Sequence, residues 1–150
     1  MKEHFPLRSD SRLSRMLHVL VHMHLLGGTE TSDTIALMLN TNPVVVRRTM
    51  AKLKKQGIVS SEGGPGGGWR LLRAPEDLTV FEIHRAITDA SIFTMSLSSD
   101  HPTCPVERAV NSRLLHAFNK AEAVLADEFG QVTLADIARD LSRPSDPSKR

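Results

Sequence analysis

The sequence has one cysteine, one tryptophan and no tyrosine among its 150 residues. A single cysteine excludes an internal disulfide framework and suits a reducing compartment, so we expect a cytoplasmic protein. The apolar run at residues 16–26 contains three histidines and is too short to cross a bilayer. No small-residue cleavage site follows that run. We therefore expect neither a secretion signal nor a membrane partner.

Acidic residues are absent between Asp33 and Glu62, while five basic residues occur there. Surface helices usually mix charge signs, because oppositely charged side chains four residues apart support the helix. The net charge of the whole chain is only +2, so the positive charge is local. This pattern favours an anionic partner such as nucleic acid. The alternative is a solvated, lysine-rich helix in an ordinary helical bundle.

The same stretch predicts two helices joined by a very short turn. We expect Ser32 to cap the first helix, residues 40–42 to form the turn, and Pro43 to begin the second helix. The second helix has one apolar face and one basic face. The apolar face carries Val46, Met50 and Leu53; the opposite face carries Val44, Val45, Arg48, Lys52 and Lys55, with Arg47 and Lys54 at the flanks. This is the helix-turn-helix pattern, whose second helix enters the DNA major groove.

Residues 62–68 contain five glycines between two short strand-like runs, 58–61 and 69–72. Such a segment predicts a β-hairpin with a glycine-rich tip. A nucleotide-binding loop would need a strand, a glycine loop and then a helix, and no such helix follows here. A hairpin directly after a recognition helix is the wing of a winged helix. Bare glycine backbone at Gly66, Gly67 and Gly68 is suited to a close approach to DNA.

Two further helices complete the predicted domain. Ser9 or Asp10 can cap a helix that runs to Leu26 and ends at a pair of glycines. Thr79 and Glu82 form a capping box that begins a helix to about residue 88. The inward face predicted for the first helix is Leu13, Met16, Leu17, Leu20 and Met23, and for the second Val80, Ile83, Ala86 and Ile87.

A long helix is predicted from Cys104 to about Phe129, because apolar residues recur there at intervals of three or four. About 25 residues span about 38 Å, which is longer than a small winged domain needs. We expect a second copy of the chain to cover this apolar stripe, although it could pack across its own domain instead. The predicted dimerisation residues are Val106, Val110, Leu114, Phe118 and Leu125. Thr133 is expected to cap a short helix at 134–141, followed by a flexible tail.

Cys104 lies at the start of the long helix, where the helix dipole favours a thiolate and His101 is near. One interpretation is a sensing site, in which oxidation of Cys104 reorients the helix. The other is a half-buried residue that only packs at a helix start. His18 and His22 lie four residues apart, but no third or fourth metal ligand has a recognisable spacing. We therefore expect no metal site.

The chain resembles the Rrf-two family of bacterial winged-helix transcriptional regulators over about residues 9–130. The resemblance lies in N-P-V-V-V-R-R-T-M-A-K-L-K-K-Q-G-I-V at residues 42–59, in the glycine-rich wing with its aromatic residue, and in L-T-V-F-E-I-H-R-A-I at 78–87. It implies a winged helix with a long dimerisation helix that binds palindromic operators. Relatives that bind an iron–sulfur cluster hold it through three cysteines. With Cys104 alone, a cluster with these ligands is excluded, and His101 or a first-helix histidine could contribute only in an unusual arrangement.

The sequence thus predicts a mainly α fold with a small β-hairpin. We assign residues 9–88 to a winged helix-turn-helix domain, 89–130 to a sensing loop and dimerisation helix, and 131–150 to a short helix and tail. The expected function is a homodimeric, DNA-binding transcriptional repressor without a cofactor, which is not an enzyme. Its predicted DNA-binding residues are Asn42, Pro43, Val44, Val45, Arg47, Arg48, Lys52, Lys55, Gly66, Gly67 and Gly68. The alternatives are a protein-interaction module and, in last place, a thiol enzyme that uses Cys104.

Overall fold

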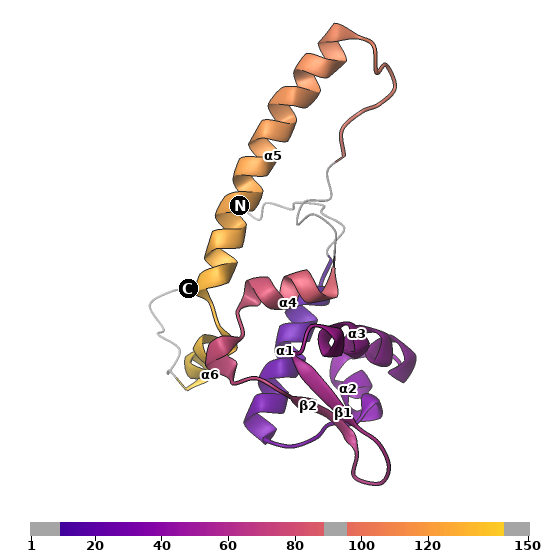
Figure 1. The fold of residues 1–150 in the computed structure, drawn as a ribbon, viewed down its shortest axis with the longest axis vertical. Helices are drawn as coiled ribbons and strands as arrows, with labels where there is room; N and C mark the ends of the chain where they lie inside the picture. Colours follow the sequence, from indigo (N-terminus) through magenta and orange to yellow (C-terminus); the bar gives the residue numbers. More distant parts are fainter. Residues whose placement is uncertain (1–9, 89–95, 143–150) are drawn as a thin grey trace, which may run out of the picture.

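The computed structural model describes residues 10–88 and 96–142. Its elements form two parts, a winged unit around one hydrophobic core and a long helix that projects away from it (Figure 1). The elements in chain order are α1 (Arg12–Leu26), α2 (Ser32–Leu39), α3 (Pro43–Lys55), β1 (Val59–Glu62), β2 (Gly68–Leu71), the 3-10 helix η1 (Pro75–Asp77), α4 (Val80–Ile87), α5 (Pro105–Gln131) and α6 (Leu134–Leu141). The predicted mainly α fold with one small hairpin is confirmed.

Helix α1 is the centre of the winged unit and packs against α2, α4, α6 and β2. Met16, Leu20 and Met23 are buried as predicted, whereas Leu13 and Leu17 are only partly buried. Val19 and Val21 are also buried, because elements contact α1 on more than one side. A single stripe therefore describes this helix incompletely. Gly27, at a φ of 68°, ends the helix in the left-handed conformation.

The helix-turn-helix has the predicted order, with one correction at its start. Thr31, not Ser32, is the N-cap of α2, and its side chain accepts a hydrogen bond from the Thr34 amide. Asn40 ends α2 at a φ of 51°. Asn42 caps α3, and Pro43 is the first helical residue, where no amide donor is needed.

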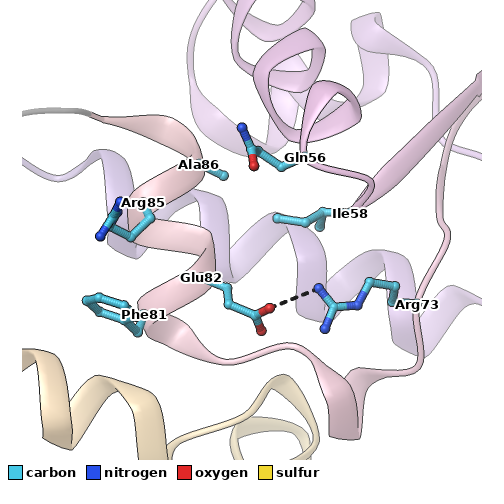
Figure 2. A pocket seen from close by; sticks show the side chains of 7 residues that line it. All are labelled: Gln56, Ile58, Arg73, Phe81, Glu82, Arg85 and Ala86. Carbon is cyan, nitrogen blue, oxygen red and sulfur yellow. Dashed lines mark hydrogen bonds and ion pairs between the residues drawn. The ribbon is translucent and has the colours of Figure 1, made fainter.

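Strands β1 and β2 form the predicted antiparallel hairpin, with Val59 opposite Leu71 and Glu62 opposite Gly68. Beyond it, Arg73 extends toward α4. Its guanidinium contacts the Glu82 carboxylate at 3.0 Å, and the two side chains point toward each other in Figure 2. Glu82 also accepts a hydrogen bond from the Thr79 amide, which completes the predicted capping box. This amide bond, together with Arg73, lowers the pKa of Glu82.

Helix α6 returns to the winged unit after α5. Leu134 is fully buried in the same core as α1, although α5 separates them in the chain. Backbone hydrogen bonds join this segment to the start of α4, from the Val80 amide to the Val132 carbonyl and from the Leu134 amide to the Leu78 carbonyl. Residues 132–141 therefore pack with residues 10–88. The predicted flexible tail lies outside the described residues, as does part of the predicted sensing loop.

Helix α5 has 27 residues and none of them is buried. It contacts the winged unit mainly through α4, and its N-terminal half extends well beyond that unit (Figure 1). The possibility that α5 packs across its own domain is thus not realised along most of its length. No helix within residues 10–88 and 96–142 is both long and apolar enough to cross a membrane.

Candidate nucleic-acid interface

Helix α3 separates an apolar face from a basic face as its sequence predicts. Val46, Met50 and Leu53 are buried in the core and fix the rotation of the helix. The opposite face is open to solvent. Its exposed residues include Val44, Val45, Arg47, Arg48, Lys52 and Lys55. An exposed face with two valines and only positive charges can contact both the bases and the phosphates of a DNA groove.

The basic side chains of this face are free of carboxylate partners within the described residues. The ion pairs recorded there involve Arg12, Arg70, Arg73 and Arg139 instead. Lys52 donates a hydrogen bond of 3.4 Å to the Ile87 carbonyl. The guanidinium groups of Arg47 and Arg48 therefore remain available to an external anion.

Asn42 and Pro43 also stabilise the start of α3. The Asn42 side chain accepts a hydrogen bond of 3.1 Å from the Val45 amide. This bond satisfies one of the free donors at the helix start. The two residues therefore define where the recognition helix begins, whether or not they also touch DNA.

Of the three wing glycines that were predicted to contact DNA, two are required by close backbone approaches. A Cβ on Gly68 would lie 2.6 Å from the Glu30 carbonyl oxygen, and a Cβ on Gly67 would collide with the Glu62 carbonyl oxygen. Gly66 faces open space and has a φ of 74°. Of these three glycines, only Gly66 lacks a packing constraint, since any side chain at the other two positions would move the wing.

Trp69 attaches the wing to the helix-turn-helix, a role that was not predicted from the sequence. Its backbone exchanges two hydrogen bonds with Glu30, at 2.8 and 2.9 Å. Its indole N–H donates to the Ser32 hydroxyl at 2.9 Å. Thr29 adds a hydrogen bond to the Gly66 carbonyl. The single tryptophan, placed directly after the glycine run, was the signal that could have identified this attachment.

Cys104 is the N-cap residue of α5 and is half-buried, but its side chain makes no capping hydrogen bond. Its amide donates to the His101 carbonyl at 2.9 Å. His101 is exposed, and its own amide donates to the Glu107 carboxylate at 3.0 Å. The structure therefore places Cys104 and His101 in one turn at the start of α5, with a carboxylate beside them.

The predicted dimerisation residues lie along α5, and none of them is buried. Val106 is 69% exposed, Val110 50% and Leu114 43%, while Phe118 and Leu125 are partly covered. Exposed apolar residues in a continuous series are typical of a surface that binds another protein.

A single cysteine does not supply the three thiolates of the family's cluster, and the donor residues that the structure describes do not form a metal site. The chain has one cysteine, and the described residues contain no group of three or more His, Cys, Asp and Glu that could hold a metal. The rings of His18 and His22 contact each other, with centroids 4.7 Å apart, but no third ligand joins them there.

A basic second helix that follows a short turn, with a glycine wing held beside it, defines a winged helix-turn-helix DNA-binding protein. The family described as Rrf2, iron-dependent transcriptional regulator, matches residues 9–140. The chain belongs to this family, whose members are transcriptional regulators and not enzymes. The family's description names iron, whereas this chain has one cysteine and its described residues contain no group that could hold a metal.

Relatives and solved structures agree with this placement. The HTH-type transcriptional regulator YwnA of Bacillus subtilis (strain 168) is 31% identical over 132 residues, which are 88% of this chain and 98% of YwnA. A transcriptional regulator from Lactobacillus plantarum has the same fold, with a TM-score of 0.75 at 22% identity over 90% of this chain and 92% of that one. IscR of T. potens has a TM-score of 0.65 at 21% identity over 95% and 96% of the two chains.

Proposed function

We propose that the chain is a homodimeric repressor that binds a palindromic operator in double-stranded DNA. Helix α3 enters the major groove, and the wing at 62–68 contacts the adjacent groove. Arg47 and Arg48 meet guanine or phosphate, while Lys52 and Lys55 meet phosphate. The observation that supports this most strongly is the exposed face of α3, which carries only positive charge and no carboxylate partner.

The dimer is supported by the apolar residues that α5 leaves uncovered. A helix of 27 residues without one buried side chain lacks the packing from which most helical stability arises in proteins. Helix-turn-helix proteins bind two half-sites through a two-fold dimer. A second copy would supply both the missing packing and the second recognition helix.

Modification of Cys104 is the input signal that we assign to this regulator. Peroxide would convert the thiolate to a sulfenic acid at the first turn of α5, adding an oxygen atom to the sulfur and releasing water or hydroxide. Cys104 is half-buried, so the added oxygen would enter a partly packed site at the start of α5. Because α5 joins the two copies, a shift at its start would change the spacing of the recognition helices. No cofactor takes part.

The test is fluorescence anisotropy with DNA from the protein's own promoter region. Arg48→Ala should weaken binding by about 1–3 kcal/mol and relax specificity at one base pair if Arg48 reads a base edge. Arg139→Ala removes a positive charge from α6 and should leave affinity unchanged. Uniform weakening across sequences would assign Arg48 to phosphate. If the protein fails to bind even random DNA at low salt, it is a protein-interaction module instead.

The switch is tested with the same DNA and a mild oxidant. Wild type should release the operator, and Cys104→Ser should stay bound. Equal behaviour of the two proteins would make Cys104 a packing residue, and the signal would then be a ligand or a partner protein.

A further inference from the structure

A small basic pocket lies between the C-terminal ends of α3 and α4. Its volume is about 230 Å³, and its cationic lining residues are Lys52 and Lys55 from α3 and Arg85 from α4. All three residues are exposed. No Asp or Glu is among the described residues that line the pocket. The pocket therefore gathers three positive charges from two helices.

Two of these cations are positioned by contacts that leave them charged. The Lys52 ammonium donates a hydrogen bond of 3.4 Å to the carbonyl of Ile87, the last residue of α4. The Arg85 guanidinium lies over the ring of Phe81, one turn earlier in α4, at 5.8 Å from the ring centroid. Such a cation–π contact orients a guanidinium without neutralising it.

The only carboxylate on α4, that of Glu82, is engaged elsewhere. Glu82 lines an adjoining cavity, which Arg85 also lines (Figure 2). Its carboxylate accepts hydrogen bonds from the Arg73 guanidinium at 3.0 Å and from the Thr79 amide at 3.1 Å. In Figure 2 the Glu82 side chain points toward Arg73. Glu82 is therefore paired with Arg73 and not with Arg85.

The two helix ends offset only part of the charge in the pocket. The C-terminal end of a helix carries about half a negative charge. Both α3 and α4 end at the pocket, so together they contribute about one negative charge against three cations. The surplus is about two positive charges. A bound anion would relieve the repulsion among the three cations, because its charge has the opposite sign.

The size and the lining of the pocket favour a single oxyanion group. Sites for drug-sized ligands measure about 300–1,000 Å³, so this pocket is too small for a whole cofactor. Its volume is several times the roughly 30 Å³ of a water molecule, which leaves room for a phosphate or a carboxylate. Arginine binds such groups through two parallel N–H bonds, and lysine binds them as a point charge.

We propose that Lys52, Lys55 and Arg85 form a binding site for a phosphate or carboxylate group. Arg48, Lys52 and Lys55 follow one another at intervals of four and three along α3, so the site lies at the end of the face assigned to DNA. The bound group comes either from the DNA backbone or from a small free anion that competes with DNA for the two lysines. The first source rests on the proposed function and extends its interface to α4, whereas the second holds without it.

The first arm of the test measures DNA affinity by fluorescence anisotropy at several salt concentrations, with circular dichroism to check folding. Arg85→Gln should reduce the slope of log affinity against log salt by about 1, the value for one lost phosphate contact. Arg85→Lys keeps the charge and should keep the slope. Arg139→Gln, which removes an exposed arginine from α6, is the control. An equal loss of slope in Arg85→Lys would overturn the proposal, because it would assign the effect to packing against Phe81.

The second arm uses no DNA. Inorganic phosphate is titrated with the protein at constant ionic strength, and its line width is followed by phosphorus NMR. Arg85→Gln should raise the dissociation constant of phosphate about tenfold, the loss expected for one charge-assisted hydrogen bond. Arg139→Gln should leave it unchanged.

The two arms distinguish the sources of the anion. A change in the first arm alone identifies the DNA backbone, and a change in the second shows that a free anion binds. If Arg85→Gln alters neither, the proposal is overturned, while DNA binding by the rest of α3 stands. If the wild type fails to bind DNA at low salt, the proposed function fails and the phosphate titration alone decides the pocket.

Discussion

The winged unit and helix α5 use their apolar residues in opposite ways. In the winged unit, every α-helix and the first strand contribute fully buried side chains to one core. Helix α5 has 27 residues, more than twice the 13 of α3, and buries none of them. Both segments have the same kind of apolar periodicity in the sequence. The comparison shows that periodicity predicts which face of a helix will be covered, but not whether the cover comes from the same chain.

Substitutions in the two regions should differ most in their effect on stability. Leu53→Ala removes a fully buried side chain and should cost about 2–5 kcal/mol of unfolding free energy. Val110→Ala, at a half-exposed position, should change it by less than about 0.5 kcal/mol when the protein is dilute enough to be monomeric. Urea denaturation at low protein concentration measures both. Comparable losses would mean that α5 is packed in the monomer.

Substitutions in the wing test whether the close contact between Gly68 and the Glu30 backbone holds the wing in place. Gly68→Ala puts a Cβ against the Glu30 carbonyl and should cost about 1–3 kcal/mol in strain or detach β2. Gly63→Ala, in open space at the same hairpin, is the control. The fluorescence of Trp69, the only tryptophan, reports detachment, and DNA anisotropy reports its effect on binding. If both variants behave alike, the contact with Glu30 is not what holds the wing.

The hydrogen bond from the Trp69 indole to Ser32 should contribute less to the unfolding free energy than the fit of Gly68 against Glu30 does. Trp69→Phe keeps an aromatic ring and removes the bond to Ser32, so we expect a loss of about 1 kcal/mol. Ser32→Ala should cost a similar amount, and the double variant should cost little more than either one. This double-mutant cycle is measured by chemical denaturation. Additive losses would show that the two side chains act independently.

The smallest expected change in stability comes from the titration of His84. Its ring centroid lies 6.3 Å from that of Phe129, where α4 meets α5. Burial lowers the pKa of His84, Asp10 opposes this shift, and Arg12 and Arg85 reinforce it. The unfolded chain therefore binds more protons between the folded pKa and about 6.5. The unfolding free energy should fall as the pH drops below about 6.5. His84→Gln should flatten this part of the pH profile, and an unchanged profile would assign the dependence to another histidine.

Much of the fold and of the candidate interface was predictable because it depends on local chemistry. The capping box at Thr79, proline at the start of α3 and the glycine-rich hairpin each act within a few residues. Thr31 and not Ser32 caps α2, and the Ser32 hydroxyl accepts a hydrogen bond from Trp69, which is 37 residues away. Trp69 signals that the wing is attached, but its partners Glu30 and Ser32 could not be predicted, since these hydrogen bonds join segments distant in the chain.

The sequence by itself determined the helix-turn-helix, the basic face of α3 and the exclusion of a three-cysteine cluster, because these follow from residue types and their spacing. Only the tertiary structure decided that α6 enters the core, that two wing glycines face backbone carbonyls, and that Arg85 meets Lys52 and Lys55 in one basic pocket. These features depend on which distant segments meet. Distant contacts are fixed by packing and loop closure over the whole chain, and no local pattern encodes them.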